Sequence, residues 1–155
     1  MLDELKISRR HLPRWTIDGA IYFVTFCTYH ITFDSEEQTI IVEHVKGGDG
    51  KFYDCFAAMV MSDHVHLLLR PKDGISLSRI MHGIKGAGAR KINLHRQTMG
   101  KVWQSESYDR IMRNQAEFDE KLNYMLNNPV KRQLTDDPGD YVGWYLNKNL
   151  LGYER

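Results

Sequence analysis

Two histidines separated by one apolar residue, His64 and His66, stand at the head of the aliphatic run that continues to Leu69. Such a run predicts a buried strand, and alternate side chains of a strand emerge on one face, so we expect both imidazoles to point the same way. Paired imidazoles are suitable ligands for a divalent metal. A short His-x-His pattern is equally typical of hydrogen-bonded histidines at a strand end, so a second motif has to separate the two interpretations.

That second motif is a helix predicted from about Asn114 to Asn128, where Pro129 is expected to end it. At about 100° per residue, its apolar side chains form one stripe, made of Phe118, Leu122, Met125 and Leu126. Tyr124 and Asn128 fall together on a different face, with Lys121 beside them. A tyrosine and an amide directed away from the core can face a common site.

These residue types suggest phosphoryl chemistry. His64, His66 and the carboxamide oxygen of Asn128 can bind a divalent cation that polarises a phosphate, while the phenol of Tyr124 attacks the phosphorus. A free tyrosine has a pKa of about 10, so it needs a nearby positive charge, and Lys121 can help to supply one. A covalent phosphotyrosine retains the energy of the broken bond. The alternative for Tyr124 is a boundary aromatic residue with its hydroxyl in water.

Length and composition describe a single domain. The 155 residues are enough to bury a core without disulfide bonds. The sequence has no run of about 18 apolar residues, and its N-terminus is polar. We therefore expect a soluble, cytoplasmic protein without a membrane span or signal peptide. Cys27 and Cys55 lie in strand-like runs and suit buried thiols in a reducing compartment.

Charge is unevenly distributed although the net charge is only +1. From Gly74 to Ser105 there is no acidic residue, and six cations fall in this window: Arg79, Lys85, Arg90, Lys91, Arg96 and Lys101. We expect this segment and the basic N-terminal arm (about 1–18), with Arg9, Arg10 and Arg14, to contact DNA phosphates. An ordinary solvated helix face is the alternative.

The remaining elements follow from periodicity. We predict strands at 20–28, 52–60 and 64–70, a helix at 35–45, a helix from Ser76, and extended segments at 101–104 and 108–113. Gly83, Gly86 and Gly88 disfavour a helix, so they indicate either close approach of another backbone or a helix end near Gly86. Residues from about 130 to 155 are expected to be an extension that packs on the domain.

Several motifs together have a familiar order and spacing. These are MSDHVHLLL (61–69), LSRIM (77–81), VWQ (102–104), YDRIMR (108–113) and YMLNNPVK (124–131), with RRHLPRW (9–15) and IYFVTF (21–26) before them. The combination closely resembles the single-tyrosine HUH transposases of the insertion-sequence-200-like group, and within it the REP-associated tyrosine transposases. The resemblance covers roughly residues 9–145.

This resemblance implies an α+β, ferredoxin-like fold with an antiparallel sheet and helices packed on it. It implies cleavage of single-stranded DNA near hairpins through a 5′-phosphotyrosine, with Mg²⁺ or Mn²⁺ as cofactor. By position, His64 and His66 match the metal ligands, Tyr124 the nucleophile and Asn128 the polar residue that completes the site. Insertion-sequence members more often have Gln at this last position. Tyr108, in another family motif, is a rival nucleophile.

Other interpretations remain open at this stage. One is a domesticated protein that binds DNA hairpins without cutting them. Another is a nucleotide-handling enzyme of the histidine-triad type, but the next alternating position is Leu68 instead of a histidine. Relatives of the resembled group include dimers that share active sites and a subgroup that acts as monomers, so both states are possible.

Overall fold

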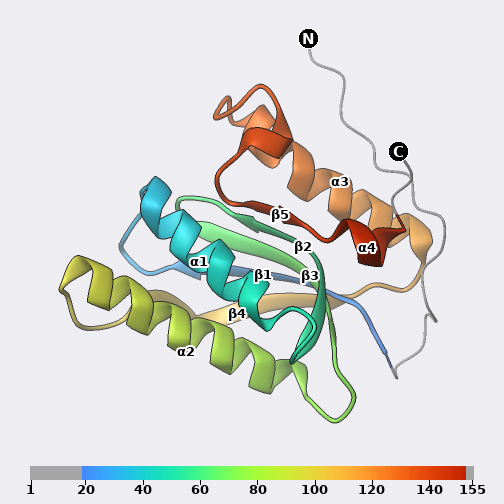
Figure 1. The fold of residues 1–155 in the computed structure, drawn as a ribbon, viewed down its shortest axis with the longest axis horizontal. Coiled ribbons are helices and arrows are strands. Elements are labelled where there is room, and N and C mark those ends of the chain that lie inside the picture. The colour runs from blue at the N-terminus through green and yellow to red at the C-terminus, as the bar shows by residue number, and fades with distance from the viewer. Residues whose placement is uncertain (1–18, 153–155) are drawn as a thin grey trace.

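The computed structural model describes residues 19–152 (Figure 1). Its first six elements are β1 (Tyr22–Thr28), α1 (Ser35–Gly48), β2 (Tyr53–Val60), β3 (His64–Pro71), α2 (Leu77–Arg96) and β4 (Trp103–Ile111). They are followed by α3 (Gln115–Lys131), the 3-10 helix η1 (Pro138–Asp140), β5 (Trp144–Leu146) and α4 (Lys148–Leu151). Arg9, Arg10 and Arg14 of the predicted basic arm lie outside the described residues.

The five strands form one antiparallel sheet in the order β4-β1-β3-β2-β5. The first six elements follow the order of a ferredoxin-like fold, strand-helix-strand-strand-helix-strand. This confirms the predicted α+β fold. The histidine strand β3 is central, and β4 lies at one edge of the sheet.

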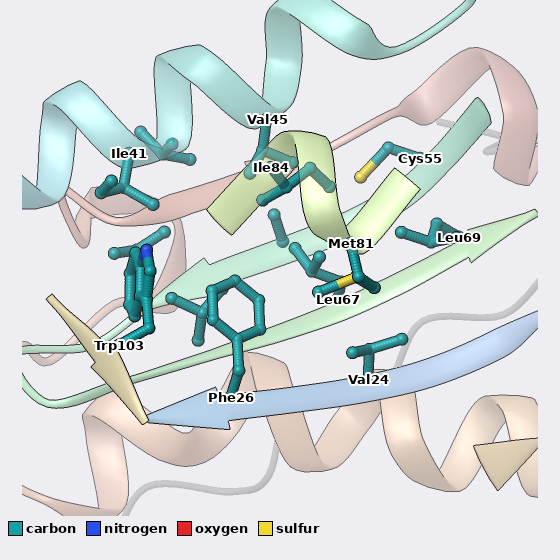
Figure 2. Close-up of a cluster of buried hydrophobic side chains, with 14 of the residues drawn as sticks. Val24, Phe26, Ile41, Val45, Cys55, Leu67, Leu69, Met81, Ile84 and Trp103 are labelled. Atoms are coloured by element: carbon teal, nitrogen blue, oxygen red, sulfur yellow. The ribbon is translucent and has the colours of Figure 1, made fainter. Parts of the chain in front are cut away.

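Helices cover both faces of the sheet (Figure 1). On one face, Val24, Phe26 and Leu67 point toward α1 and α2 (Figure 2). On the other face, Phe23 and Leu68 pack with residues of α3 and α4. Because side chains alternate along a strand, each strand contributes to both cores.

Strands β2 and β3 are therefore buried on both faces. All eight residues of β2 are buried, and so are the first six of β3. Cys55 is fully buried and is not in a disulfide, in agreement with the predicted buried thiol. Cys27 is also free, but it is only partly buried. None of the described helices is both long and apolar enough to cross a membrane.

Helix α2 runs to Arg96, well past the possible end near Gly86. The structure explains one of the three glycines, Gly88, because a Cβ there would lie 3.2 Å from Ile41 Cδ1 of the neighbouring helix α1. The close neighbour at Gly88 is thus a side chain of the protein, and not the other backbone that the sequence led us to expect. A Cβ at Gly83 or Gly86 would meet nothing within 4 Å, and the structure does not explain these two glycines.

Two further boundaries differ from the sequence prediction. The segments expected at 101–104 and 108–113 form one continuous strand, β4. Helix α3 does not end before Pro129 but continues to Lys131, so Pro129 lies inside it. The N–H of Arg132 donates to the carbonyls of Asn128 and Val130 and closes this last turn.

Residues after α3 complete the sheet. Strand β5 pairs with β2 and covers its outer edge. Tyr145 and Asn147 both donate hydrogen bonds of 2.7 Å to Oδ2 of Asp49, which follows α1. The described part of the segment, residues 130–152, therefore packs on the preceding elements.

Candidate active site

The two histidines of β3 lie side by side on the face covered by α3. Their ring centroids are 4.7 Å apart, and His64 and His66 are only 9% and 5% exposed. Alternation along the strand puts both on this face, while Val65 between them packs in the opposite core. The predicted common orientation of the two imidazoles is confirmed.

Each imidazole is held through its Nδ1 atom. Nδ1 of His66 lies 2.8 Å from Oγ1 of Thr25 on β1, and Nδ1 of His64 lies 2.7 Å from Oδ1 of Asp63. Partners of this kind fix the orientation and tautomer of ligating histidines in metalloproteins. They leave Nε2 of both rings as the atoms that can bind a metal.

Burial also sets the charge state of His66. Desolvation lowers its pKa to about 3, with further lowering from His64, Arg132 and Lys121. His66 is therefore neutral near pH 7. A neutral imidazole is the form that ligates metals, because its nitrogen lone pair is free.

Helix α3 brings the predicted tyrosine and amide to this pair. The ring centroid of Tyr124 lies 5.5 Å from that of His66, and Tyr124 remains 48% exposed. Nδ2 of the buried Asn128 lies 3.5 Å from Nε2 of His66. The amide oxygen and nitrogen exchange places by a flip of the side chain, so either atom can face His66.

Lys121 lies one turn before Tyr124 on the same flank of α3. Its Nζ is 5.1 Å from the ring centroid of Phe23 and 6.0 Å from that of Tyr124. Phe23 in turn stacks on His66, with centroids 5.3 Å apart. A positive charge therefore lies beside the exposed phenol, next to the histidine pair.

The rival tyrosine, Tyr108, lies on the edge strand β4. Its backbone pairs with Thr25, which pairs on its other side with His66. Tyr108 is thus separated from the histidine strand by the whole of β1. Tyr124, which contacts His66 directly, is closer to the pair.

Five of the six cations in the window from Gly74 to Ser105 lie on α2, on the other side of the sheet, and the sixth, Lys101, lies between α2 and β4. Two of the five on α2 are engaged within the protein. Arg96 forms a salt bridge with the buried Glu37 and donates to the carbonyl of Thr32, 2.6 Å away. Nζ of Lys85 donates to the carbonyl of Gln104, 2.8 Å away.

The other three cations on α2 are exposed. They are Arg79, Arg90 and Lys91. Their guanidinium and ammonium groups are the ones on α2 best placed to meet DNA phosphates. The basic residues of α2 therefore fall into two groups: those that bond within the protein and those that are exposed to solvent.

The residues that hold the histidines were not identified from the sequence. Thr25 is a polar residue inside the largely apolar strand β1, which is a weak signal of a polar partner on the next strand. Asp63 directly precedes His64, but this adjacency alone does not predict a hydrogen bond to the imidazole. The pairing of β1 with β3, which gives Thr25 its role, is a long-range property.

Comparison with known proteins gives the family. The family model "Transposase IS200 like" matches residues 24–127, more than half of the chain. The chain belongs to this family. The sequence resemblance described above is confirmed.

Two solved structures share the fold of this IS200-like transposase. One, "Structure of the REP associates tyrosine transposase bound to a REP hairpin", has a TM-score of 0.66 and 18% identity over 85% of this chain and 79% of that chain. The other, a putative transposase from Deinococcus radiodurans R1, has a TM-score of 0.50 and 18% identity over 80% and 98%. No curated protein matches the sequence of this transposase.

The donor atoms of the transposase site fit a divalent metal of the kind the sequence implies. No cluster of three or more His, Cys, Asp or Glu side chains suited to a metal occurs among residues 19–152. The atoms that could serve as donors are instead the two Nε2 atoms and the Asn128 carboxamide. This is a small set that leaves positions open for substrate oxygen atoms, as in catalytic metal sites.

Proposed function

We propose that this transposase cleaves and rejoins single-stranded DNA near hairpins, with Tyr124 as the nucleophile. The observation that carries the proposal is the convergence of Tyr124 and Asn128 of α3 on His66 of β3. A half-exposed phenol beside buried, oriented imidazoles is suited to attack on a phosphate that enters from solvent.

In the proposed step, Oη of Tyr124 attacks the phosphorus and the bond from phosphorus to the 3′ oxygen breaks. The phenolic proton passes to solvent and the leaving 3′ oxygen takes a proton from solvent, so that one DNA fragment leaves with a 3′-hydroxyl and the other stays on Tyr124 as a 5′-phosphotyrosine. A second 3′-hydroxyl can reverse the step, because the phosphodiester energy is retained in the protein link. Lys121 stabilises the negative charge that develops near the phenol.

His64, His66 and Asn128 are proposed to hold Mg²⁺ or Mn²⁺. The metal supplies Lewis acid chemistry at the phosphate when it is bound. Thr25 and Asp63 keep the two Nε2 atoms directed toward it, and burial keeps His66 deprotonated. The chain's own contribution is thus a set of ligands held in place before metal binding, of which His66 is already deprotonated.

A DNA hairpin is the proposed partner. A structure similar to this one is described as bound to a REP hairpin, and this chain carries exposed cations on α2, namely Arg79, Arg90 and Lys91. We propose that these cations contact the hairpin phosphates, together with Arg9, Arg10 and Arg14 of the N-terminal arm. Lys85 and Arg96 contribute less, because their charges are already bound within the protein.

The decisive experiment is covalent capture. The protein is incubated with Mn²⁺ and an oligonucleotide that carries a hairpin and an unpaired flank, and the products are separated under denaturing conditions. We expect a protein-DNA adduct that Tyr124→Phe abolishes and that Tyr29→Phe, a control at another exposed tyrosine, leaves in place. An adduct kept in Tyr124→Phe but absent from Tyr108→Phe would assign the attack to Tyr108.

The second candidate is hairpin binding without cleavage. The basic face of α2 supports it as well, since it lies away from the tyrosine site. Tight hairpin binding by the wild-type protein without an adduct in either Mg²⁺ or Mn²⁺ would favour this candidate over cleavage.

A further inference from the structure

Tyr108 occupies a specific position relative to the proposed active site. Backbone pairing aligns Tyr108 of β4 with Thr25 of β1, and Thr25 with His66 of β3. Directly paired residues of an antiparallel sheet direct their side chains to the same face. The three side chains therefore form one row, which we call the tyrosine row, from the edge of the sheet to the histidine pair.

Tyr108 differs from the rest of the row in its exposure. Its side chain is 57% exposed, whereas Thr25 is partly buried, His66 is buried, and the two are hydrogen-bonded to each other. Neighbouring strands are about 4.8 Å apart, so the backbone of Tyr108 lies about 10 Å from that of His66. One DNA strand can reach both residues.

Arg110 lies beside this aromatic ring, with its charge paired to Glu117. It lies two residues after Tyr108 on the same face and pairs across the sheet with Phe23. Glu117 of α3 accepts a 2.9 Å hydrogen bond from its Nη2, which fixes the guanidinium. Glu117, followed by the Tyr108 hydroxyl, raises the pKa of Arg110, so the ring and the guanidinium are close neighbours.

An exposed aromatic ring next to cations is the arrangement that binds unpaired nucleotides. Bases stack on the ring, and the cations attract the backbone phosphates. Lys121 lies over the ring of Phe23, and Phe23 pairs with Arg110, so both basic residues are neighbours of Phe23. Because the charge of Arg110 is already bound to Glu117, Lys121 is the one of these two that can attract a phosphate. The surface has the composition for single-stranded DNA and adjoins the phenol that is proposed to attack it.

We propose that Tyr108 is a positioning residue that stacks on an unpaired base next to the phosphate attacked by Tyr124. This inference rests on the proposed function, and it gives Tyr108 a role other than nucleophile. Stacking at the edge of the sheet holds the strand so that the adjacent phosphate lies over the histidine pair. Since every base has a π face, this contact selects unpaired DNA without selecting its sequence.

The first test measures binding without cleavage. In a Tyr124→Phe background, we expect Tyr108→Ala to weaken binding of an unpaired oligonucleotide about 5- to 100-fold, as removal of one base-aromatic stack does. Tyr108→Phe should restore most of the affinity, because stacking needs the ring and not the hydroxyl. Phe52→Ala is the matched control: Phe52 is 54% exposed but lies with α1 and α2 on the opposite face.

The second test locates the stacked base. A 5-iodouracil placed next to the cleaved phosphate should crosslink on irradiation to the peptide that contains Tyr108, and the crosslink should vanish in Tyr108→Ala. Equal affinity of Tyr108→Ala and its parent, or crosslinking only elsewhere, would overturn the stacking role and leave the proposed function intact. If the Tyr124→Phe parent itself binds no unpaired DNA, both proposals fail.

Discussion

Thr25 and His66 face each other across β1 and β3, with Oγ1 of the threonine 2.8 Å from Nδ1 of the histidine. The hydroxyl is the only polar group that the β1 register places opposite this imidazole within residues 19–152. It determines which ring nitrogen is left for a ligand, so the site depends on a strand that carries no proposed ligand itself.

Replacement of this hydroxyl tests its role. Thr25→Val keeps the shape of the side chain and removes the hydrogen bond, so we expect the affinity for Mn²⁺ to fall about 10- to 100-fold, as it does when other partners of ligating histidines are removed. Isothermal titration calorimetry measures this without DNA. Thr39→Val is the control, because the Thr39 hydroxyl bonds only to its own helix α1. Unchanged Mn²⁺ affinity in Thr25→Val would contradict the orienting role.

The pKa of His66 predicts a pH dependence of stability. Burial lowers this pKa to about 3, from about 6.5 in the unfolded chain. Between these values the unfolded chain binds more protons, so the free energy of unfolding falls as the pH falls from about 6.5 toward 3. For one group the slope approaches about 1.4 kcal/mol per pH unit.

Urea unfolding at pH values from about 7 to about 4.5, within the window where the unfolded chain binds the extra proton, measures this effect. The slope of unfolding free energy against pH is proportional to the number of protons that the chain takes up on unfolding. We expect this number to be lower by about one in His66→Asn. Burial also lowers the pKa of His44, but His44 titrates in both proteins and cancels in the difference. Parallel slopes for the two proteins would mean that His66 is not a neutral buried imidazole.

Arg96 and Arg90 lie on the same helix, but their replacement should affect the free energy of unfolding very differently. Arg96→Ala leaves the carboxylate of Glu37 buried without its main partner, so we expect a decrease of about 3 kcal/mol in unfolding free energy. Arg90 is exposed, so Arg90→Ala should change the free energy of unfolding by less than about 0.5 kcal/mol. Thermal and urea unfolding compare the two variants, and equal decreases would contradict a structural role for Arg96.

Hairpin affinity should depend on salt through the exposed cations of α2. With Arg79, Arg90 and Lys91 all replaced by Gln, we expect the slope of log affinity against log salt to fall by about 0.9 for each DNA phosphate that the variant no longer neutralises. Fluorescence anisotropy over a range of KCl concentrations measures the slope. Lys148→Gln, on α4 at the other face, should leave it unchanged. A triple variant with the wild-type slope would place the hairpin-binding surface elsewhere.

Local patterns predicted most of the fold, because the core strands and α3 carry strong periodic signals. They also predicted that Tyr124 is directed away from the core, which the structure shows. Asn128 was expected to do the same but is buried against His66. Their roles, and those of His64 and His66, stay predictions. The side of the sheet covered by each helix was not predictable, because it depends on strand order.

The errors at element boundaries have different causes. Pro129 was expected to end α3, but its own missing N–H costs only one bond near the end of the helix, and Arg132 closes the last turn. Gly88 was a helix breaker by propensity and is in fact where α1 and α2 approach closely. At Gly88, packing between distant segments outweighs the local preference, whereas the cause at Pro129 is local.

The sheet also acts as a partition. The exposed cations of α2 and the phenol of Tyr124 lie on opposite sides of it, and its hydrogen-bonded strands leave no passage between them. In the proposed function, a DNA molecule held by both must therefore pass around the outside, and Tyr108 on the edge strand β4 marks one such route. The length of unpaired DNA needed to pass around the β4 edge of the sheet would then set the distance between the hairpin and the cleaved phosphate.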